Sequence, residues 1–131
     1  MILLDTCAII WDALDQSRLS IKAKRAIDRA DQNNALVISD ISIWEIVMLV
    51  KKGRIEIDTS AANFLNLFLQ SRNVSVIQIS PEIAELSTHL GFDLSNDPAD
   101  RLIVATSVVH NAQLITADQK LLDNELLDTL W

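Results

Sequence analysis

The sequence predicts a helix that begins at Asp97-Pro98-Ala99-Asp100-Arg101 and continues through Leu102-Ile103-Val104-Ala105-Thr106. Proline suits the first helical turn, where its missing N–H would have no partner. Asp97 is therefore the expected N-cap, and Asp100 falls three residues later, in the position of the acid of a capping box. Both carboxylates have a simple explanation as caps. Whether they do more depends on where the other isolated acids of the chain fall.

Short apolar segments alternate with helical patterns along the rest of the chain. Continuous apolar runs at 1–4 and 35–38 predict strands buried on both faces, as in a parallel sheet, and two further short strands are expected at 74–79 and 113–116. Helices are expected at 20–33, from Ser42 to near Gly53, after Thr59 or Ser60, and from Pro81 to Gly91. This alternation indicates an α/β fold with a mostly parallel sheet and right-handed crossovers.

Two of these helices carry apolar stripes. In the helix at 20–33 the residues expected to face inward are Ile21, Ala23, Ala26, Ile27 and Ala30. The helix after Ser60 carries a stripe of Phe64, Leu65, Phe68 and Leu69, which fits either the core or a dimer face. Together with Ile43, Trp44 and Val47, this stripe exceeds what a small core readily covers, so exposed apolar surface is expected.

Length and composition indicate one globular domain over residues 1–131. Half of the residues are hydrophobic and only two are Gly, which is unlike disordered chains. The sequence has no apolar run of about 20 residues, as a membrane span needs, and no signal-peptide pattern. The single cysteine, Cys7, cannot form an internal disulfide. The cytoplasm is the expected location, with no membrane association.

The net charge of −7 is unevenly distributed. Residues 1–72 carry nine basic and nine acidic side chains, whereas residues 73–131 carry two basic and nine acidic ones. An acidic chain does not bind nucleic acid through bulk charge. A phosphate-bearing substrate would therefore need a local basic patch or bound metal ions.

Four acids stand at related places in the predicted sheet: Asp5, Glu45, Asp100 and Asp118. Asp5 and Asp118 directly follow strands, Asp100 enters a helix, and Glu45 ends a Ser-x-x-Glu capping box that starts at Ser42. Each acid taken alone is explained as a helix cap. However, the carboxyl ends of parallel strands and the N-termini of the following helices share one edge of the sheet. All four carboxylates can therefore converge in one crevice.

Clustered carboxylates repel each other and need protons or cations. Hard divalent ions such as Mg²⁺ and Mn²⁺ prefer oxygen ligands, and helix N-termini favour the ionised form of nearby acids. A carboxylate-bound metal pair suits phosphodiester cleavage by an activated water. No His, Cys or Lys stands where it could act as the nucleophile, so metal-activated water is the expected chemistry.

The chain resembles the PIN-domain proteins, specifically the VapC-type toxin ribonucleases of toxin–antitoxin pairs. Four segments carry the resemblance, in the family's order: Ile2-Leu3-Leu4-Asp5-Thr6, Ser42-Ile43-Trp44-Glu45-Ile46, Asp97-Pro98-Ala99-Asp100-Arg101-Leu102-Ile103 and Leu114-Ile115-Thr116-Ala117-Asp118. The resemblance implies a PIN-like three-layer α/β/α fold with a mostly parallel sheet of four to five strands. It also implies a Mg²⁺- or Mn²⁺-dependent endoribonuclease whose metal-binding and catalytic quartet is Asp5, Glu45, Asp100 and Asp118.

The resemblance assigns supporting roles to Thr6, Thr116 and Asp97, with Asp97 either near the ligands or only a cap. RNA would be held by basic side chains that lie mostly in the neutral half of the chain: Lys22, Lys24, Arg25, Arg29, Lys51, Lys52, Arg54 and Arg101. Arg101 has an alternative role as the salt-bridge partner of a neighbouring acid. The implied protein partners are a small antitoxin and a second copy of the chain in a homodimer.

Three other functions compete with this interpretation. A phosphoacceptor receiver domain would want paired acids after the first strand and an acceptor Asp after the third, where Ser80-Pro81 follows Ile79. A phosphatase with an aspartyl nucleophile would want a second Asp two places after Asp5, where Cys7 stands. A PIN-like scaffold that binds RNA or protein without cleaving it remains open at this stage.

Overall fold

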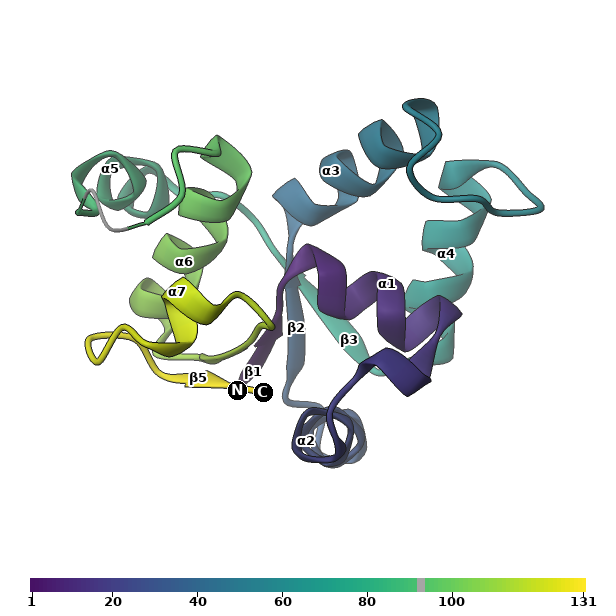
Figure 1. Ribbon diagram of the computed structural model, residues 1–131, viewed down its shortest axis with the longest axis horizontal. Coiled ribbons are helices and arrows are strands. Elements are labelled where there is room, and N and C mark those ends of the chain that lie inside the picture. The colour runs from purple at the N-terminus through teal and green to yellow at the C-terminus, as the bar shows by residue number, and fades with distance from the viewer. Residues whose placement is uncertain (92–93) are drawn as a thin grey trace.

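A five-stranded parallel sheet forms the centre of the computed structural model, which describes residues 1–91 and 94–131 (Figure 1). The strands are β1 (Ile2–Leu4), β2 (Leu36–Ser39), β3 (Val74–Ile77), β4 (Gln113–Ile115) and β5 (Thr129–Leu130), in the spatial order β3-β2-β1-β4-β5. Every neighbouring pair is parallel. The predicted α/β fold with a parallel sheet is confirmed. The sequence predicts four of these strands by position, and β5 is the additional one.

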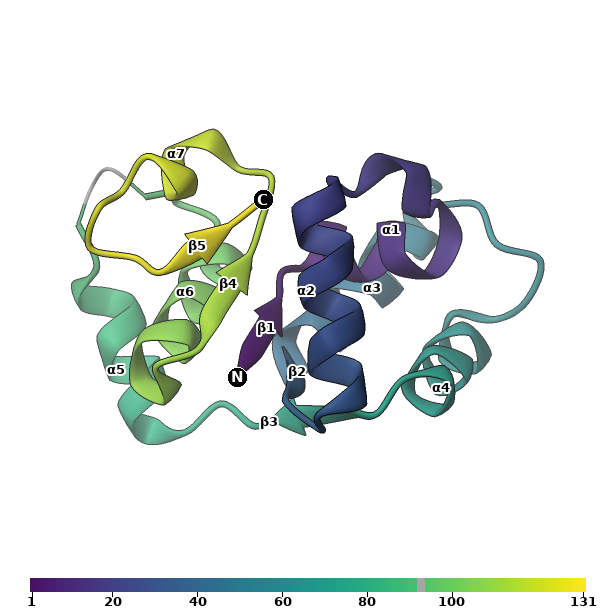
Figure 2. The same ribbon diagram turned by 90° about the horizontal axis from the view of Figure 1, so that it is seen from below.

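Helices cover both faces of this sheet. They are α1 (Thr6–Leu14), α2 (Ile21–Gln32), α3 (Asp40–Lys51), α4 (Ala61–Ser71), α5 (Pro81–His89), α6 (Pro98–His110) and α7 (Gln119–Leu122), with a 3₁₀ turn at Gln16–Arg18. Figure 2 shows α1, α2 and α4 on one side of β1 and β2, with α5 and α6 on the other. The expected three layers are therefore present.

Alternation along the strands explains the two apolar cores. Leu4 and Ile38 face one side of the sheet and pack with α1 to α4, whereas Leu3 and Val37 face the other side and pack with α6. Both sets are almost fully buried. Successive strand side chains point to opposite faces, so a strand covered on both faces must be apolar at every position. This is why the strands appear as continuous apolar runs in the sequence.

Local capping signals set most of the helix ends. The hydroxyls of Ser20, Ser60 and Ser80 accept hydrogen bonds from backbone N–H groups of the first turns of α2, α4 and α5, as N-caps do. Gly53 has a φ of 71°. Its N–H bonds to the Val50 carbonyl, and the next N–H bonds to the Leu49 carbonyl, both at 3.0 Å. This pattern ends α3 in the way predicted from the glycine.

The predicted start of α3 is wrong. The helix begins at Asp40, directly after β2, and its N-cap is Ser39, whose hydroxyl accepts from the Ile41 N–H at 3.3 Å. Ser42 and Glu45 therefore do not form a capping box, because both lie inside the helix. Glu45 is in the second turn, and it is not needed to cap anything.

The predicted exposure of the α4 stripe is also wrong. Phe64, Leu65 and Phe68 are buried against the sheet and α1, so they belong to the core and not to a dimer face. On α2, Ile21 was expected to face inward but is 72% exposed. On α3 the expected exposure is confirmed for Trp44 and Val47 but wrong for Ile43, which is partly buried against the core.

A charged cluster fastens the helices on the α1 side. Arg72 donates two hydrogen bonds to Asp12, at 2.7 and 3.1 Å, and one each to Asp28 and Asp31, at 3.0 and 3.1 Å. These contacts tie α1, α2 and the start of β3 together. Among the described residues, no helix is long and apolar enough to cross a bilayer.

Candidate functional site

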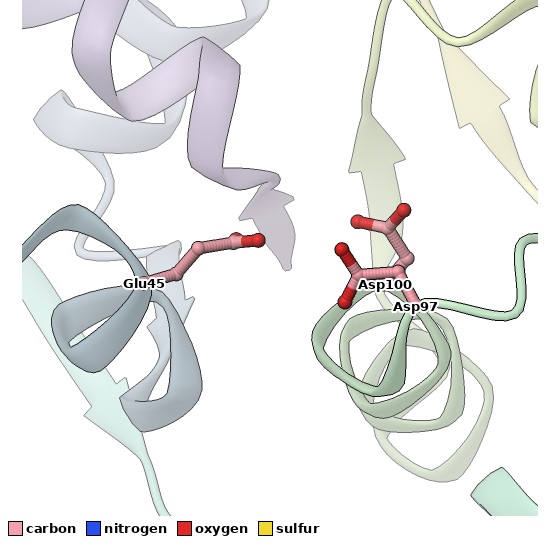
Figure 3. Close-up of side chains that lie close together, drawn as sticks. All are labelled: Glu45, Asp97 and Asp100. Atoms are coloured by element: carbon pink, nitrogen blue, oxygen red, sulfur yellow. The ribbon is translucent and has the colours of Figure 1, made fainter. Parts of the chain in front are cut away.

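Three carboxylates meet between α3 and α6. Glu45 reaches across from the second turn of α3 toward Asp97 and Asp100 at the N-terminus of α6 (Figure 3). One carboxylate oxygen from each residue lies within 4.8 Å of those of the other two. Oxygen donors that converge in this way fit a hard divalent cation such as Mg²⁺ or Mn²⁺. Asp97, expected only in support, is one of the three.

Asp5 lies beside this cluster at the end of β1. Its Oδ1 accepts a hydrogen bond from the Ala8 N–H at 2.8 Å and caps α1. The pKa of Asp5 is raised to about 6, mainly by burial and to a smaller extent by the charges of Asp100 and Glu45, while hydrogen bonds from Thr116 and Ala8 act to lower it. These couplings put Asp5 in the same electrostatic environment as the cluster.

Glu45 and Asp100 are shifted in the same direction. Burial raises the pKa of Glu45, and the nearby charges of Asp100 and Asp97 add to this. Burial also raises the pKa of Asp100, with further contributions from the charges of Asp97 and Asp118. Asp118 is the N-cap of α7 and accepts from the Lys120 N–H at 3.0 Å. The sheet edge thus gathers all four predicted acids, with Asp5 and Asp118 outside the closest group of three.

The strand order explains why they meet. β2 and β4 flank β1 on opposite sides, so the connections from β1 and β4 diverge there. In open α/β sheets, ligand sites form outside the carboxyl ends of strands at such a switch point. The order also differs from the 2-1-3-4-5 order of receiver-type domains, which contradicts the receiver alternative.

Comparison with known proteins agrees with this geometry. The PIN domain family pattern matches residues 2–125. The chain belongs to the PIN-domain family. It is 32% identical to Ribonuclease VapC22 of Mycobacterium tuberculosis over 120 residues. This alignment covers 92% of this chain and 88% of the relative. This match places it among the VapC-type ribonuclease toxins.

Solved structures support the same assignment for this PIN domain. A toxin–antitoxin complex from Klebsiella pneumoniae contains a chain with a TM-score of 0.68 and 25% identity, covering 100% of this chain and 97% of that one. VapBC2 from Rickettsia felis, bound to a promoter DNA fragment, gives a TM-score of 0.75 at 20% identity, covering 99% and 98%. The second likeness shows the PIN-like fold alone.

Hydroxyl groups position the acids of this PIN domain. The buried Thr6 hydroxyl lies in hydrogen-bond contact with the carboxylate of Glu45 and 3.0 Å from the hydroxyl of Ser42. The hydroxyl of Thr116, which is also buried, accepts from the Asp118 N–H at 3.1 Å. Sequence reasoning missed Ser42, which has no local signal because its partner is 36 residues away. It also missed Ser95, whose hydroxyl accepts from the Asp97 N–H at 3.0 Å.

A groove opens directly from the acidic cluster of the PIN domain. Its volume is about 770 Å³, and both Glu45 and Asp97 line it. Trp44, Lys52 and Arg54 line it as well. Two of the cations predicted to hold RNA are therefore beside the acids, and Lys51 lies on the last turn of the same helix.

The remaining predicted cations are placed elsewhere. Lys22, Arg25 and Arg29 line a separate cavity of about 420 Å³ together with the first residues of β1 and β4, at the opposite edge of the sheet. Lys24 lies on the same helix, α2, which Figure 1 shows at the bottom of the view. Arg101 donates to the carbonyls of three residues that precede or lead into α6, Ser87, Leu90 and Ser95. It therefore fastens the approach to the site.

Proposed function

We propose that this PIN domain is a Mg²⁺- or Mn²⁺-dependent endoribonuclease that acts as the toxin of a toxin–antitoxin pair. The observation that carries the proposal is the convergence of Glu45, Asp97 and Asp100 within 4.8 Å of one another, beside Asp5, at the switch point of the sheet. Carboxylates held this close and shifted upward in pKa are suited to binding a cation.

The residues proposed to hold the metal are Asp5, Glu45, Asp100 and Asp118, with Asp97 added by its position. When bound, Mg²⁺ or Mn²⁺ supplies an activated water for attack on the phosphodiester and offsets negative charge on the leaving oxygen. Phosphodiester hydrolysis by water then requires no nucleophilic side chain. The chain's own contribution is to keep the carboxylates ionised and fixed in place.

Fixing the carboxylates depends on hydroxyls and helix N-termini. The Thr6 hydroxyl donates to Glu45 and holds its long side chain in one rotamer. The N-termini of α1, α6 and α7 present backbone N–H groups to Asp5, Asp97 and Asp118. The bond from Ala8 lowers the pKa of Asp5 and so favours the charged form that a cation needs.

The partners follow from the relatives and from the chemistry. Structural relatives are toxin–antitoxin complexes, and we propose that a small antitoxin binds this chain, which is itself a homodimer. An inserted Arg or Lys of the antitoxin could pair with the acidic cluster and exclude metal. An RNA substrate also supports the cytoplasm as the place of action.

A non-catalytic scaffold is the alternative that remains to be tested. Purified protein is incubated with total RNA in Mg²⁺, in Mn²⁺ and in EDTA, and the product ends are mapped. We expect cleavage at defined sites with either metal and none in EDTA. Glu45→Gln serves as the variant that keeps the side-chain shape. Equal patterns in metal and EDTA, or equal cleavage by Glu45→Gln, would refute the metal-dependent nuclease.

A further inference from the structure

The groove beside the acidic cluster carries an aromatic side chain that the metal site does not use. Trp44 precedes Glu45 in α3, lines the groove and is 58% exposed. The other two tryptophans are not free in this way, because Trp11 and Trp131 pack edge to face with ring centroids 5.5 Å apart. Met48 and Leu49 line the groove as well, and an apolar groove next to a reactive site indicates a contact with a ligand.

Two cations stand in the same groove. Lys52 and Arg54 flank Gly53, whose left-handed turn fixes where their backbones leave α3. The three salt bridges found among residues 1–91 and 94–131 are all made by Arg72, so neither groove cation is engaged in one of them. The chain as a whole has a net charge of −7, so these two cations give the groove a positive charge that most of the surface lacks.

An aromatic ring with neighbouring cations is the chemistry that binds single-stranded nucleic acid. Bases stack on the ring while the cations contact the phosphates, and sequence-specific recognition of RNA also uses unpaired bases that stack on aromatic side chains. A base pair inside a duplex does not present a free face. The groove therefore favours an unpaired RNA segment over a duplex.

Resting on the proposed function, we propose that Trp44 stacks a base of single-stranded RNA next to the cleaved bond, while Lys52 and Arg54 bind the adjoining phosphates. Because Trp44 lines the same groove as Glu45 and Asp97, a base on its ring belongs to a nucleotide close to the acidic cluster. The carboxylates repel phosphate and the two cations attract it, so the strand crosses the groove with its backbone on the cation side. This makes Trp44 a residue that sets the preference for unpaired RNA and aligns the cut.

Binding is measured separately from cleavage, with a short 2′-O-methyl oligouridine in EDTA. We expect Trp44→Ala to raise the Kd about tenfold or more, because the variant loses base stacking. A tenfold change in Kd corresponds to ~1.4 kcal/mol of binding free energy. Trp44→Phe keeps a stacking face and should bind within about threefold of the parent. RNA should quench the fluorescence of the parent protein, and this quenching should disappear in Trp44→Phe although the RNA still binds.

Charge and a matched control complete the test. Lys52→Ala and Arg54→Ala should each lower the slope of log Kd against log salt by about 1, as the loss of one phosphate contact does. Leu126→Ala removes another exposed apolar side chain, 92% exposed and outside the groove, and should leave the Kd unchanged. Sedimentation velocity should show the same oligomeric state for Trp44→Ala as for the parent.

The failure of this inference differs from that of the proposed function. If the parent cleaves RNA, and Trp44→Ala has the same RNA affinity and the same fluorescence quenching as the parent, the stacking role is overturned. The nuclease assignment is then unaffected. A Trp44→Ala protein that loses a dimer, or binding of the antitoxin, while keeping its RNA affinity shows that the groove is a protein interface. A parent that neither binds nor cleaves RNA overturns both.

Discussion

Asp5→Asn should stabilise the metal-free protein. The substitution removes one negative charge from the acidic site and keeps an N-cap of equal quality, because Asn accepts the Ala8 N–H bond as Asp does. The volume and shape of the side chain are almost unchanged. The variant therefore isolates the electrostatic cost of the carboxylate from its capping role.

The size of the effect follows from the pKa of Asp5. The folded protein holds it at about 6, against a reference value of 3.8, mainly through burial. The unfolded chain therefore ionises more readily, and the ionised native state is penalised at neutral pH. At ~1.36 kcal/mol per pKa unit, the ionised carboxylate lowers the free energy of unfolding by about 3 kcal/mol once the pH exceeds the folded pKa. This is an upper value because Asp5 is only partly buried. The penalty is relieved as the pH falls through 6 toward 3.8.

Thermal and urea unfolding in EDTA measure this penalty. Near pH 7.5, Asp5→Asn should exceed the parent by about 1–3 kcal/mol, or roughly 3–10 °C in Tm. Below about pH 3.8 the two proteins should converge, since Asp5 is then neutral in both the folded and the unfolded parent. Mg²⁺ should raise the Tm of the parent by mass action and that of the variant less.

The control is Asp15→Asn, which alters an exposed cap in the 3₁₀ turn, outside the carboxylate cluster. It should show no stabilisation at either pH. If Asp5→Asn were equal to or less stable than the parent near neutral pH, in EDTA, the reasoning that crowding and burial strain this carboxylate would be refuted.

Three further variants test other parts of the structure. Asp100→Asn should lower metal-dependent RNA cleavage at least about a hundredfold, since a metal role is worth several kcal/mol and ~1.4 kcal/mol is tenfold in rate; an unchanged rate would remove Asp100 from the ligands. Arg72→Met should cost about 3–5 kcal/mol in urea unfolding, because it leaves Asp12, whose side chain is 3% exposed, as an uncompensated buried charge. Adding Asp12→Asn should restore part of that loss, and no recovery would contradict the ion-pair explanation. Gly53→Ala should cost about 1–2 kcal/mol through its φ of 71° alone, since nothing lies within 4 Å of an added Cβ; an unchanged midpoint would contradict it.

The parts of this fold that could be predicted are those with local causes. Strand positions followed from apolar runs, because β1 and β2 are covered on both faces and have no polar side to interrupt the run. The caps at Ser60, Ser80 and Asp97 were predictable because a cap bonds to an N–H two or three residues away. Once strands and caps are placed, the common edge of the strands follows, and with it the meeting of the acids.

The parts that could not be predicted depend on distant partners. Ser39 and Ser42 are both suitable caps, and only the packing of Thr6 on Ser42 shows that the second is used otherwise. Arg72 has three acidic partners, each more than 40 residues away in sequence. The two-residue strand β5 is positioned by its pairing with β4, where the N–H groups of Leu114 and Thr116 donate to the carbonyls of Asp128 and Leu130, and two residues are too few to form a pattern.

Three acids of the proposed site are also helix caps, so the two interpretations of the sequence do not exclude each other. Asp5, Asp97 and Asp118 each use Oδ1 to cap a helix. For Asp97 and Asp118 the hydrogen bonds found among the described residues engage only that oxygen, so Oδ2 has no hydrogen bond among them. A cap bond also fixes the side-chain rotamer and favours the ionised form. In this parallel sheet every helix that starts at the carboxyl edge needs such a cap, so a cation site there can be built from caps with only Glu45 and Asp100 added.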